Sequence, residues 1–178
     1  MKTLLVKMRG VSKAPPVAQR DEILLAFVGS SLALGLVAML HGLCLENTGL
    51  PLIMAPFGAS AVLLFGAFKS PLAQPRNVIG GHIISALVGV SIYQIVGDYP
   101  MLAASLAVPT AIVLMHASNT LHPPGGATAF VTSAGGAAVH SLGYWYVLTP
   151  SAAGSAIMVL VALVVNNLHR RHRYPQFW

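Results

Sequence analysis

Apolar residues in this chain form long runs that are separated by short polar segments. The first run covers residues 23–45, carries no charged residue and is long enough to cross a bilayer as a single helix. Five further apolar runs follow, at about residues 50–68, 77–96, 101–119, 122–140 and 151–168. The pattern predicts an all-α integral membrane protein with about six transmembrane segments.

The composition indicates the same class of protein. Of the 178 residues, 56% are hydrophobic and only 8% are charged, whereas a soluble domain carries about 25% charged residues. We therefore expect the lipid bilayer as the main partner. The length suits one domain, with a basic tail at 1–22, a transmembrane domain at 23–168 and a second basic tail at 169–178. The single cysteine, Cys44, excludes a disulfide framework within one chain.

The distribution of charge predicts the orientation in the membrane. A net charge of +6 would suggest nucleic acid in a soluble protein, but here Lys and Arg gather in both tails and in the loop at 69–76. Such segments stay on the cytoplasmic side, and the acidic Glu46 and Asp98 lie in the loops between them. We expect a multi-pass protein of the bacterial inner (plasma) membrane, with both termini cytoplasmic and no nucleic-acid partner.

The segment at 122–143 decides the number of crossings. If it crosses, six segments place every Lys and Arg on the cytoplasmic side, whereas five segments leave one basic tail on the wrong side. Four crossings remain possible if the segments at 50–68 and 122–140 are re-entrant.

The stretch from His122 to Thr128 does not suit a regular membrane helix. It contains Pro123 and Pro124, which lack a backbone N–H, followed by two glycines. Proline is favoured at the first position of a helix, so a helix is expected to begin near Pro124 after an irregular loop. Irregular backbone within a bilayer is tolerated only where protein buries it or where it lines a polar cavity. We therefore expect the functional centre here.

A second copy of this motif occurs earlier in the chain. PFGASA at 56–61 matches PGGATA at 124–129, which lies 68 residues further on. Both copies open the middle segment of a three-segment half, and an odd number of segments gives the two halves opposite orientations. The prediction is two inverted three-span repeats with broken or re-entrant helices at the Pro-Gly motifs. Chance similarity among small residues is the alternative.

Two such helix starts would favour a small anion. A helix N-terminus presents unpaired N–H groups and about half a positive charge, and no Lys, Arg or carboxylate lies within a predicted span. A small monovalent anion or a small neutral solute is therefore expected, bound near the bilayer midplane. The candidate substrate-binding residues are Pro56, Phe57, Gly58, Ala59, Ser60, Asn119, His122, Pro123, Pro124, Gly125, Gly126, Ala127 and Thr128.

Three histidines are candidates for proton coupling. His122 heads the broken segment and is suited either to donate to an anion and titrate, or to cap loop carbonyls. His82 and His116 lie at the cytoplasmic ends of their spans, where proton transfer and interfacial hydrogen bonding are both open. The others are expected to be structural, in loops or solvated in the tail: His41, His140, His169 and His172. Their spacing gives no metal site, and no cofactor is expected.

Three motifs carry a resemblance to a known family. They are PFGASAVLLFG at 56–66, PLAQPRNVIGGH at 71–82 and HPPGGA at 122–127. Over about residues 20–170 the chain resembles the HPP family of integral membrane proteins, usually described with four or more spans. Plant-chloroplast and cyanobacterial members are implicated in nitrite transport, so the resemblance implies nitrite as substrate.

Together these features predict a secondary transporter or channel for a small monovalent anion. A pore for another small solute and a non-transport membrane subunit, in which the motifs only shape helix packing, are the alternatives. An enzyme is not expected, since the sequence has no paired carboxylates and no nucleophile–base arrangement. A homo-oligomer is compatible with the small apolar chain.

Overall fold

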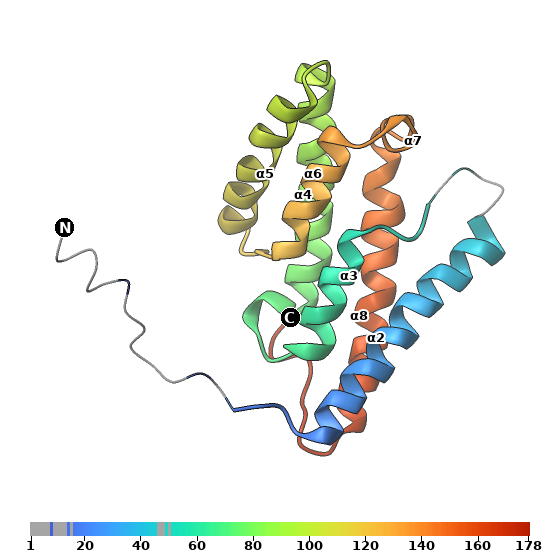
Figure 1. Cartoon of the computed structure of the whole chain (residues 1–178), viewed down its shortest axis with the longest axis vertical. Helices are drawn as coiled ribbons and strands as arrows, with labels where there is room; N and C mark the ends of the chain where they lie inside the picture. Colours follow the sequence, from blue (N-terminus) through green and yellow to red (C-terminus); the bar gives the residue numbers. More distant parts are fainter. Residues whose placement is uncertain (1–7, 9–13, 15, 46–48, 50) are drawn as a thin grey trace.

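The computed structural model describes residues 8, 14, 16–45, 49 and 51–178, and this part of the chain is helical, with no strand. Figure 1 shows the helices gathered into one bundle. The elements in chain order are α2 (Arg20–Leu40), η1 (His41–Leu45), α3 (Pro56–Ala61), η2 (Val62–Gly66), η3 (Pro71–Ala73), α4 (Pro75–Val96), α5 (Pro100–Ala117), α6 (Pro123–Ala134), α7 (Ala137–His140), η4 (Val147–Ala152) and α8 (Ala153–Leu168).

Proline sets the start of several helices. Each of these prolines stands in the first turn, where its missing N–H would have no partner and its fixed φ already suits a helix. The prolines are Pro56 in α3, Pro75 in α4, Pro100 in α5 and Pro123 in α6. Both copies of the Pro-Gly motif therefore begin a helix, as expected from the sequence.

Four helical units of the described chain are long and apolar enough to cross a membrane. They are Arg20–Leu45, Pro75–Val96, Pro100–Ala117 and Val147–Leu168. The two motif helices are shorter: Pro56–Gly66 is a short apolar helix, and α6 has 12 residues. The prediction of a multi-pass, all-helical membrane protein is confirmed, while full-length helices account for four of the six expected segments.

The direction of the chain alternates from one segment to the next (Figure 1). We call the end that holds Arg20, Lys69 and His169 the basic end; there Asp21 Oδ2 lies 2.9 Å from His169 Nε2. From it, α2 runs away, α3 with η2 returns, α4 runs away, α5 returns, α6 runs away and α8 returns. The start of α4 meets the end of α5, where Arg76 Nη2 donates to the Ser118 carbonyl over 2.8 Å.

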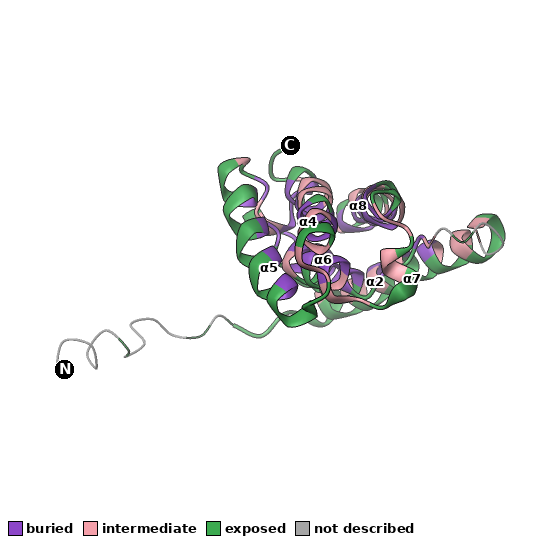
Figure 2. Ribbon diagram, turned by 90° about the horizontal axis from the view of Figure 1, so that it is seen from above, coloured by how far each residue is buried: buried purple, intermediate pink, exposed green. Residues whose placement is uncertain are grey.

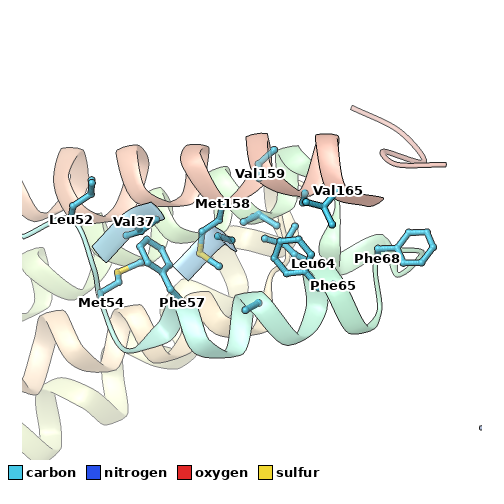
Figure 3. Close-up of a cluster of buried hydrophobic side chains, with 14 of the residues drawn as sticks. Val37, Leu52, Met54, Phe57, Leu64, Phe65, Phe68, Met158, Val159 and Val165 are labelled. Atoms are coloured by element: carbon cyan, nitrogen blue, oxygen red, sulfur yellow. The ribbon is translucent and has the colours of Figure 1, made fainter. Parts of the chain in front are cut away.

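The helices pack in two groups. In the first group α2, α8 and the α3–η2 segment enclose the larger apolar core, in which Phe57, Leu64 and Met158 are fully buried (Figure 3). In the second group α4, α5 and α6 pack closely against one another around a smaller core that includes Ala107, Ala111 and Ala129. Contacts of α4 with η4 and α8, and of α3 with α6, join the two groups.

Close helix contacts in the second group depend on glycine. A Cβ added to Gly125 would lie 2.7 Å from Ser85 Oγ and 3.0 Å from the Gly81 carbonyl oxygen. A Cβ on Gly81 would lie 2.6 Å from the Cβ of His122. Both glycines therefore serve the close approach of α6 to α4. By contrast, Gly58 has no neighbour within 4 Å of such an atom.

The outward surface of the bundle is apolar. Large hydrophobic side chains of α2, α5 and α8 are more than half exposed, among them Phe27 at 68%, Val113 at 64% and Val164 at 64%. Figure 2 shows exposed residues along the outer sides of these helices and buried residues between them. Apolar exposure on this scale suits lipid contact and would be unfavourable in water.

The C-terminal tail packs onto the basic end. Tyr174 Oη donates to the Ala73 carbonyl over 2.8 Å, and the ring of His172 packs against Phe68 with centroids 4.3 Å apart. The expectation that His169 and His172 are solvated is therefore wrong. The reason is that α2 begins with acidic residues: Asp21 bonds to His169, and Glu22 lies 3.6 Å from His172.

Candidate functional site

Both motif helices send polar side chains to one point inside the bundle. Ser60 comes from α3, His82 from α4, and Thr128 from α6, while His122 immediately precedes α6. All four are 0% exposed. Four of the residues that sequence analysis proposed for binding or proton coupling thus form one buried cluster, which we call the His–Ser–Thr cluster.

The members of the cluster are joined by short hydrogen bonds. Ser60 Oγ lies 2.8 Å from His82 Nε2 and 2.9 Å from His122 Nε2. His82 Nδ1 lies 2.8 Å from Thr128 Oγ1, and His122 Nδ1 lies 2.8 Å from the Leu72 carbonyl oxygen. The four side chains and this carbonyl form a chain of hydrogen bonds, at whose end Thr128 Oγ1 also lies 3.4 Å from the Pro124 carbonyl oxygen.

The Leu72 carbonyl sets the direction of this chain. Since a carbonyl only accepts, His122 Nδ1 carries hydrogen and donates to it. With neutral imidazoles, His122 Nε2 then accepts from the Ser60 hydroxyl, Ser60 Oγ accepts from His82 Nε2–H, and His82 Nδ1 accepts from Thr128. This assignment follows from the partners of each ring nitrogen. It satisfies every polar atom of both rings.

The surroundings of the cluster are apolar or neutral. Phe57 meets the His82 ring edge to face at a centroid distance of 5.3 Å, and Ser85 donates to Met115 Sδ beside Gly125. No Lys, Arg, Asp or Glu side chain of the described residues forms a recorded contact with either imidazole. The cluster is therefore a neutral polar centre inside an apolar bundle.

The remaining candidate residues divide between the interior and the surface. Pro56, Phe57, Pro124 and Gly125 are buried, and Gly126 is half-buried. The exposed ones are Gly58, Ala59, Asn119, Pro123 and Ala127, and His116 is exposed as well. His116 is therefore not part of the cluster, and Asn119, with φ of 56°, forms the left-handed turn that ends α5.

Backbone N–H groups at the two helix starts are largely occupied. Pro56, Pro123 and Pro124 have none. Phe57 N donates to the Met54 carbonyl over 3.0 Å, and Gly125 N donates to the His122 carbonyl over 2.8 Å. Side-chain hydroxyls are therefore better placed than these backbone groups to donate hydrogen bonds at the centre.

A second group of hydroxyls, which the sequence analysis did not identify, meets at Met54. Its sulfur lies 4.0 Å from Thr128 Oγ1, 3.7 Å from Tyr146 Oη and 3.9 Å from Ser151 Oγ. Met54 and Tyr146 also line a cavity of about 400 Å³ that lies among η1, α7 and the loop before α3. Only the position of Met54 just before the first motif was a signal in the sequence.

The other histidines have structural positions. His140 stacks on Tyr93 at a centroid distance of 3.5 Å. His41 lines the same 400 Å³ cavity, and its buried Nδ1 has no hydrogen-bond partner within the described part of the chain. Among the residues that the structure describes, no three His, Cys, Asp or Glu side chains are grouped as in a metal site.

The fold and the cluster define a multi-pass helical membrane protein with a buried neutral polar centre. The chain belongs to the HPP family: the model for the HPP transmembrane region matches residues 15–175. Two transmembrane proteins of Dictyostelium discoideum are similar, one 43% identical over 97% of this chain and the other 39% identical over 95%. The chain spans 56% and 60% of their lengths. No solved structure matches.

Proposed function

We propose that this protein transports a small monovalent anion across the membrane, with nitrite as the first candidate. The observation that carries the proposal is the His–Ser–Thr cluster, in which both broken motif helices contribute polar groups to one buried point. A bundle that needed polar residues only for packing would not require four of them at a place shielded from both water and lipid.

The chemistry of the centre favours an anion over a cation. It offers hydroxyl and imidazole groups and the starts of two helices, and none of the described residues brings to it the carboxylates that a cation site uses. The absence of Lys and Arg favours weak binding of a monovalent ion, which is what a transporter or channel needs for release. We also propose transport, rather than catalysis, as the activity of this protein.

We further propose six crossings built as two inverted halves, with the basic end in the cytoplasm. The three segments that run away from the basic end alternate with the three that return (Figure 1). Within this arrangement α3 runs toward the basic end and α6 runs away from it, which is the relation expected for inverted copies of one motif. The shortness of α3–η2 and α6 then reflects the irregular segments that precede them.

Nitrite flux into proteoliposomes tests the proposed function. Thr128→Val keeps the shape of the side chain and removes its hydroxyl, and we expect it to lower nitrite flux about tenfold or more. Thr110→Val, on the exposed face of α5, is the matched control and should retain wild-type flux.

Competition by nitrate, formate and an uncharged solute distinguishes the alternatives. An anion transporter should be inhibited by the anions alone. Absence of nitrite flux in a folded wild-type preparation would contradict the proposal and favour the subunit role, whereas swelling with an uncharged solute would favour a neutral pore.

A further inference from the structure

We propose that the hydroxyls of Thr128, Tyr146 and Ser151 form the anion-binding site, that the Met54 sulfur occupies it in this structure, and that the anion binds together with one proton held by His82 and His122. This inference rests on the proposed function and adds the position of the site, a gating side chain and the coupling ion.

Three hydroxyls from different parts of the chain meet at one sulfur atom. Thr128 lies on α6, Tyr146 immediately precedes η4 and Ser151 lies in η4. Among the residues that the structure describes, Tyr146 Oη and Ser151 Oγ have no hydrogen-bond acceptor other than Met54 Sδ, at 3.7 and 3.9 Å. A thioether is a weak acceptor, so these hydroxyls are poorly satisfied. An anion at the position of the sulfur would accept stronger, charge-assisted hydrogen bonds from them.

Met54 also lines a cavity. This cavity of about 400 Å³ lies among η1, α7 and the loop before α3, and its lining includes Met54, Tyr146, His41 and Leu142. Methionine is unbranched and adapts its shape easily. Rotation of Met54 out of its present position would open the three hydroxyls to the cavity, so its side chain acts as a gate.

In the neutral state the cluster leaves Thr128 unable to donate to an anion. The Thr128 hydroxyl has one hydrogen, and the direction of the chain set by the Leu72 carbonyl assigns that hydrogen to His82 Nδ1, 2.8 Å away. The Thr128 oxygen therefore turns lone pairs toward the Met54 position. A neutral cluster would repel an anion there.

One added proton reverses this arrangement. If His122 carries hydrogen on both nitrogens, its Nε2–H donates to Ser60, Ser60 donates to His82 Nε2, and His82 Nδ1–H donates to Thr128 Oγ1. If the charge resides on His82 instead, its Nδ1–H again donates to Thr128. In both cases the Thr128 hydrogen no longer points to His82. It then turns to the Pro124 carbonyl, 3.4 Å away, or to an anion at the Met54 position, which is the stronger acceptor. The proton comes from water, and the step changes only N–H and O–H bonds.

The described groups around the two imidazoles are uncharged, so the added proton supplies the positive charge at this place. Ser60 and Phe57 face them from α3, Thr128 from α6 and the Leu72 carbonyl from η3, while Gly81 of α4 lies against the Cβ of His122 and Tyr146 lies beyond Met54. The nearest recorded cationic side chain on α4, Arg76, is exposed and donates to Ser118 instead. Proton and anion thus compensate each other, and a proton and an anion enter the buried site as a neutral pair.

The experiment measures nitrite uptake by proteoliposomes under an imposed pH gradient and, separately, an imposed membrane potential. We expect uptake of wild-type protein to rise with acid on the donor side and to be insensitive to voltage, because the pair carries no net charge. Tyr146→Phe and Ser151→Ala should each raise KM for nitrite about tenfold. The matched controls, Tyr144→Phe and Ser141→Ala, are exposed and should leave KM unchanged.

Met54→Leu keeps the volume of the gate, so we expect it to retain transport, whereas Met54→Ala should lower KM because the site is no longer occupied. Nitrite uptake that responds to voltage but not to pH, or that keeps its KM in Tyr146→Phe and Ser151→Ala, would overturn this inference and leave the proposed function standing. No nitrite uptake at all in folded wild-type protein would overturn the proposed function itself.

Discussion

At the scale of single residues, the glycines of the motifs differ in how closely neighbouring atoms approach them. Gly81 and Gly125 allow α4 and α6 to approach, because a Cβ at either position would meet a neighbour within 3.0 Å. At Gly126 the nearest atom to such a Cβ is on Val108, 3.8 Å away, and at Gly58 there is open space. Helix packing therefore requires glycine at positions 81 and 125, whereas no close contact requires it at positions 58 and 126.

We expect Gly125→Ala to destabilise the protein by about 1–3 kcal/mol, because the added methyl group overpacks the contact with Ser85 and Gly81. Gly126→Ala is the matched control on the same helix, where ordinary van der Waals space is available. Thermal unfolding of both variants in detergent measures the difference. Equal midpoints for the two variants would contradict the packing argument.

At the scale of elements, the C-terminal tail belongs to the packed structure of the basic end. Tyr174 is buried and bonds to Ala73, and Gln176 N donates to Gln74 Oε1 over 2.7 Å. A cavity of about 500 Å³ between the start of α2 and the loop after η2 is lined by His172 and Lys69. The tail thus bridges α2 and the loop that carries Lys69, with His172 contacting both Glu22 and Phe68.

Docking of the tail should weaken as pH falls below about 6.5, the ordinary pKa of histidine. Burial against Phe68, and then the neighbouring His169, lower the pKa of His172, so docking favours its neutral form. A lowered pKa in the docked state means that docking is fullest above the ordinary value and is lost on acidification. The fluorescence of Trp178, in a Trp145→Phe background, measures the release.

The His169–Asp21 contact, 2.9 Å long, also joins the tail to α2. The titration is therefore made in a His169→Gln background. His172→Phe keeps the contact with Phe68 and removes the titrating group, so we expect its fluorescence to be independent of pH. A pH-dependent release that persists in this variant would assign the effect to another group.

At the scale of the whole molecule, the path of the chain makes a prediction about sidedness. Cys44 is exposed at the end of η1, away from the basic end, and Lys69 is exposed at the basic end. In a six-crossing protein Ser141, after α7, lies on the same side as Cys44, and Asn119 lies on the side of Lys69. Four crossings with re-entrant motif segments would place Lys69 and Cys44 on one side.

Labelling of single cysteines with an impermeant thiol reagent measures this arrangement. Cys44 and Ser141→Cys should be labelled from outside intact cells, and Lys69→Cys and Asn119→Cys only after permeabilisation, with Cys44→Ala as the background for the three new cysteines. Labelling of Lys69→Cys from outside would exclude the six-crossing path.

By itself, the sequence determined the class of protein and the places where its helices begin. Hydropathy is a sum over neighbouring residues, and the effect of Pro56 or Pro123 on a helix is local, so neither depends on the rest of the fold. The sequence likewise determined that both Pro-Gly motifs begin helices and that the family is HPP. Each of the motifs PFGASAVLLFG and HPPGGA is an unbroken stretch of residues, so it can be identified without knowledge of the fold.

Only the tertiary structure decided which side chains meet. Ser60 and His122 are 62 residues apart in the chain, and Met54 and Ser151 are 97 apart. Neither separation follows from a helical period, because contacts between helices depend on how α3, α4, α6 and η4 cross and on which positions are small enough for close approach. The same long-range packing buried His172, which the local charge of its tail had suggested to be solvated, and left His116 on the surface.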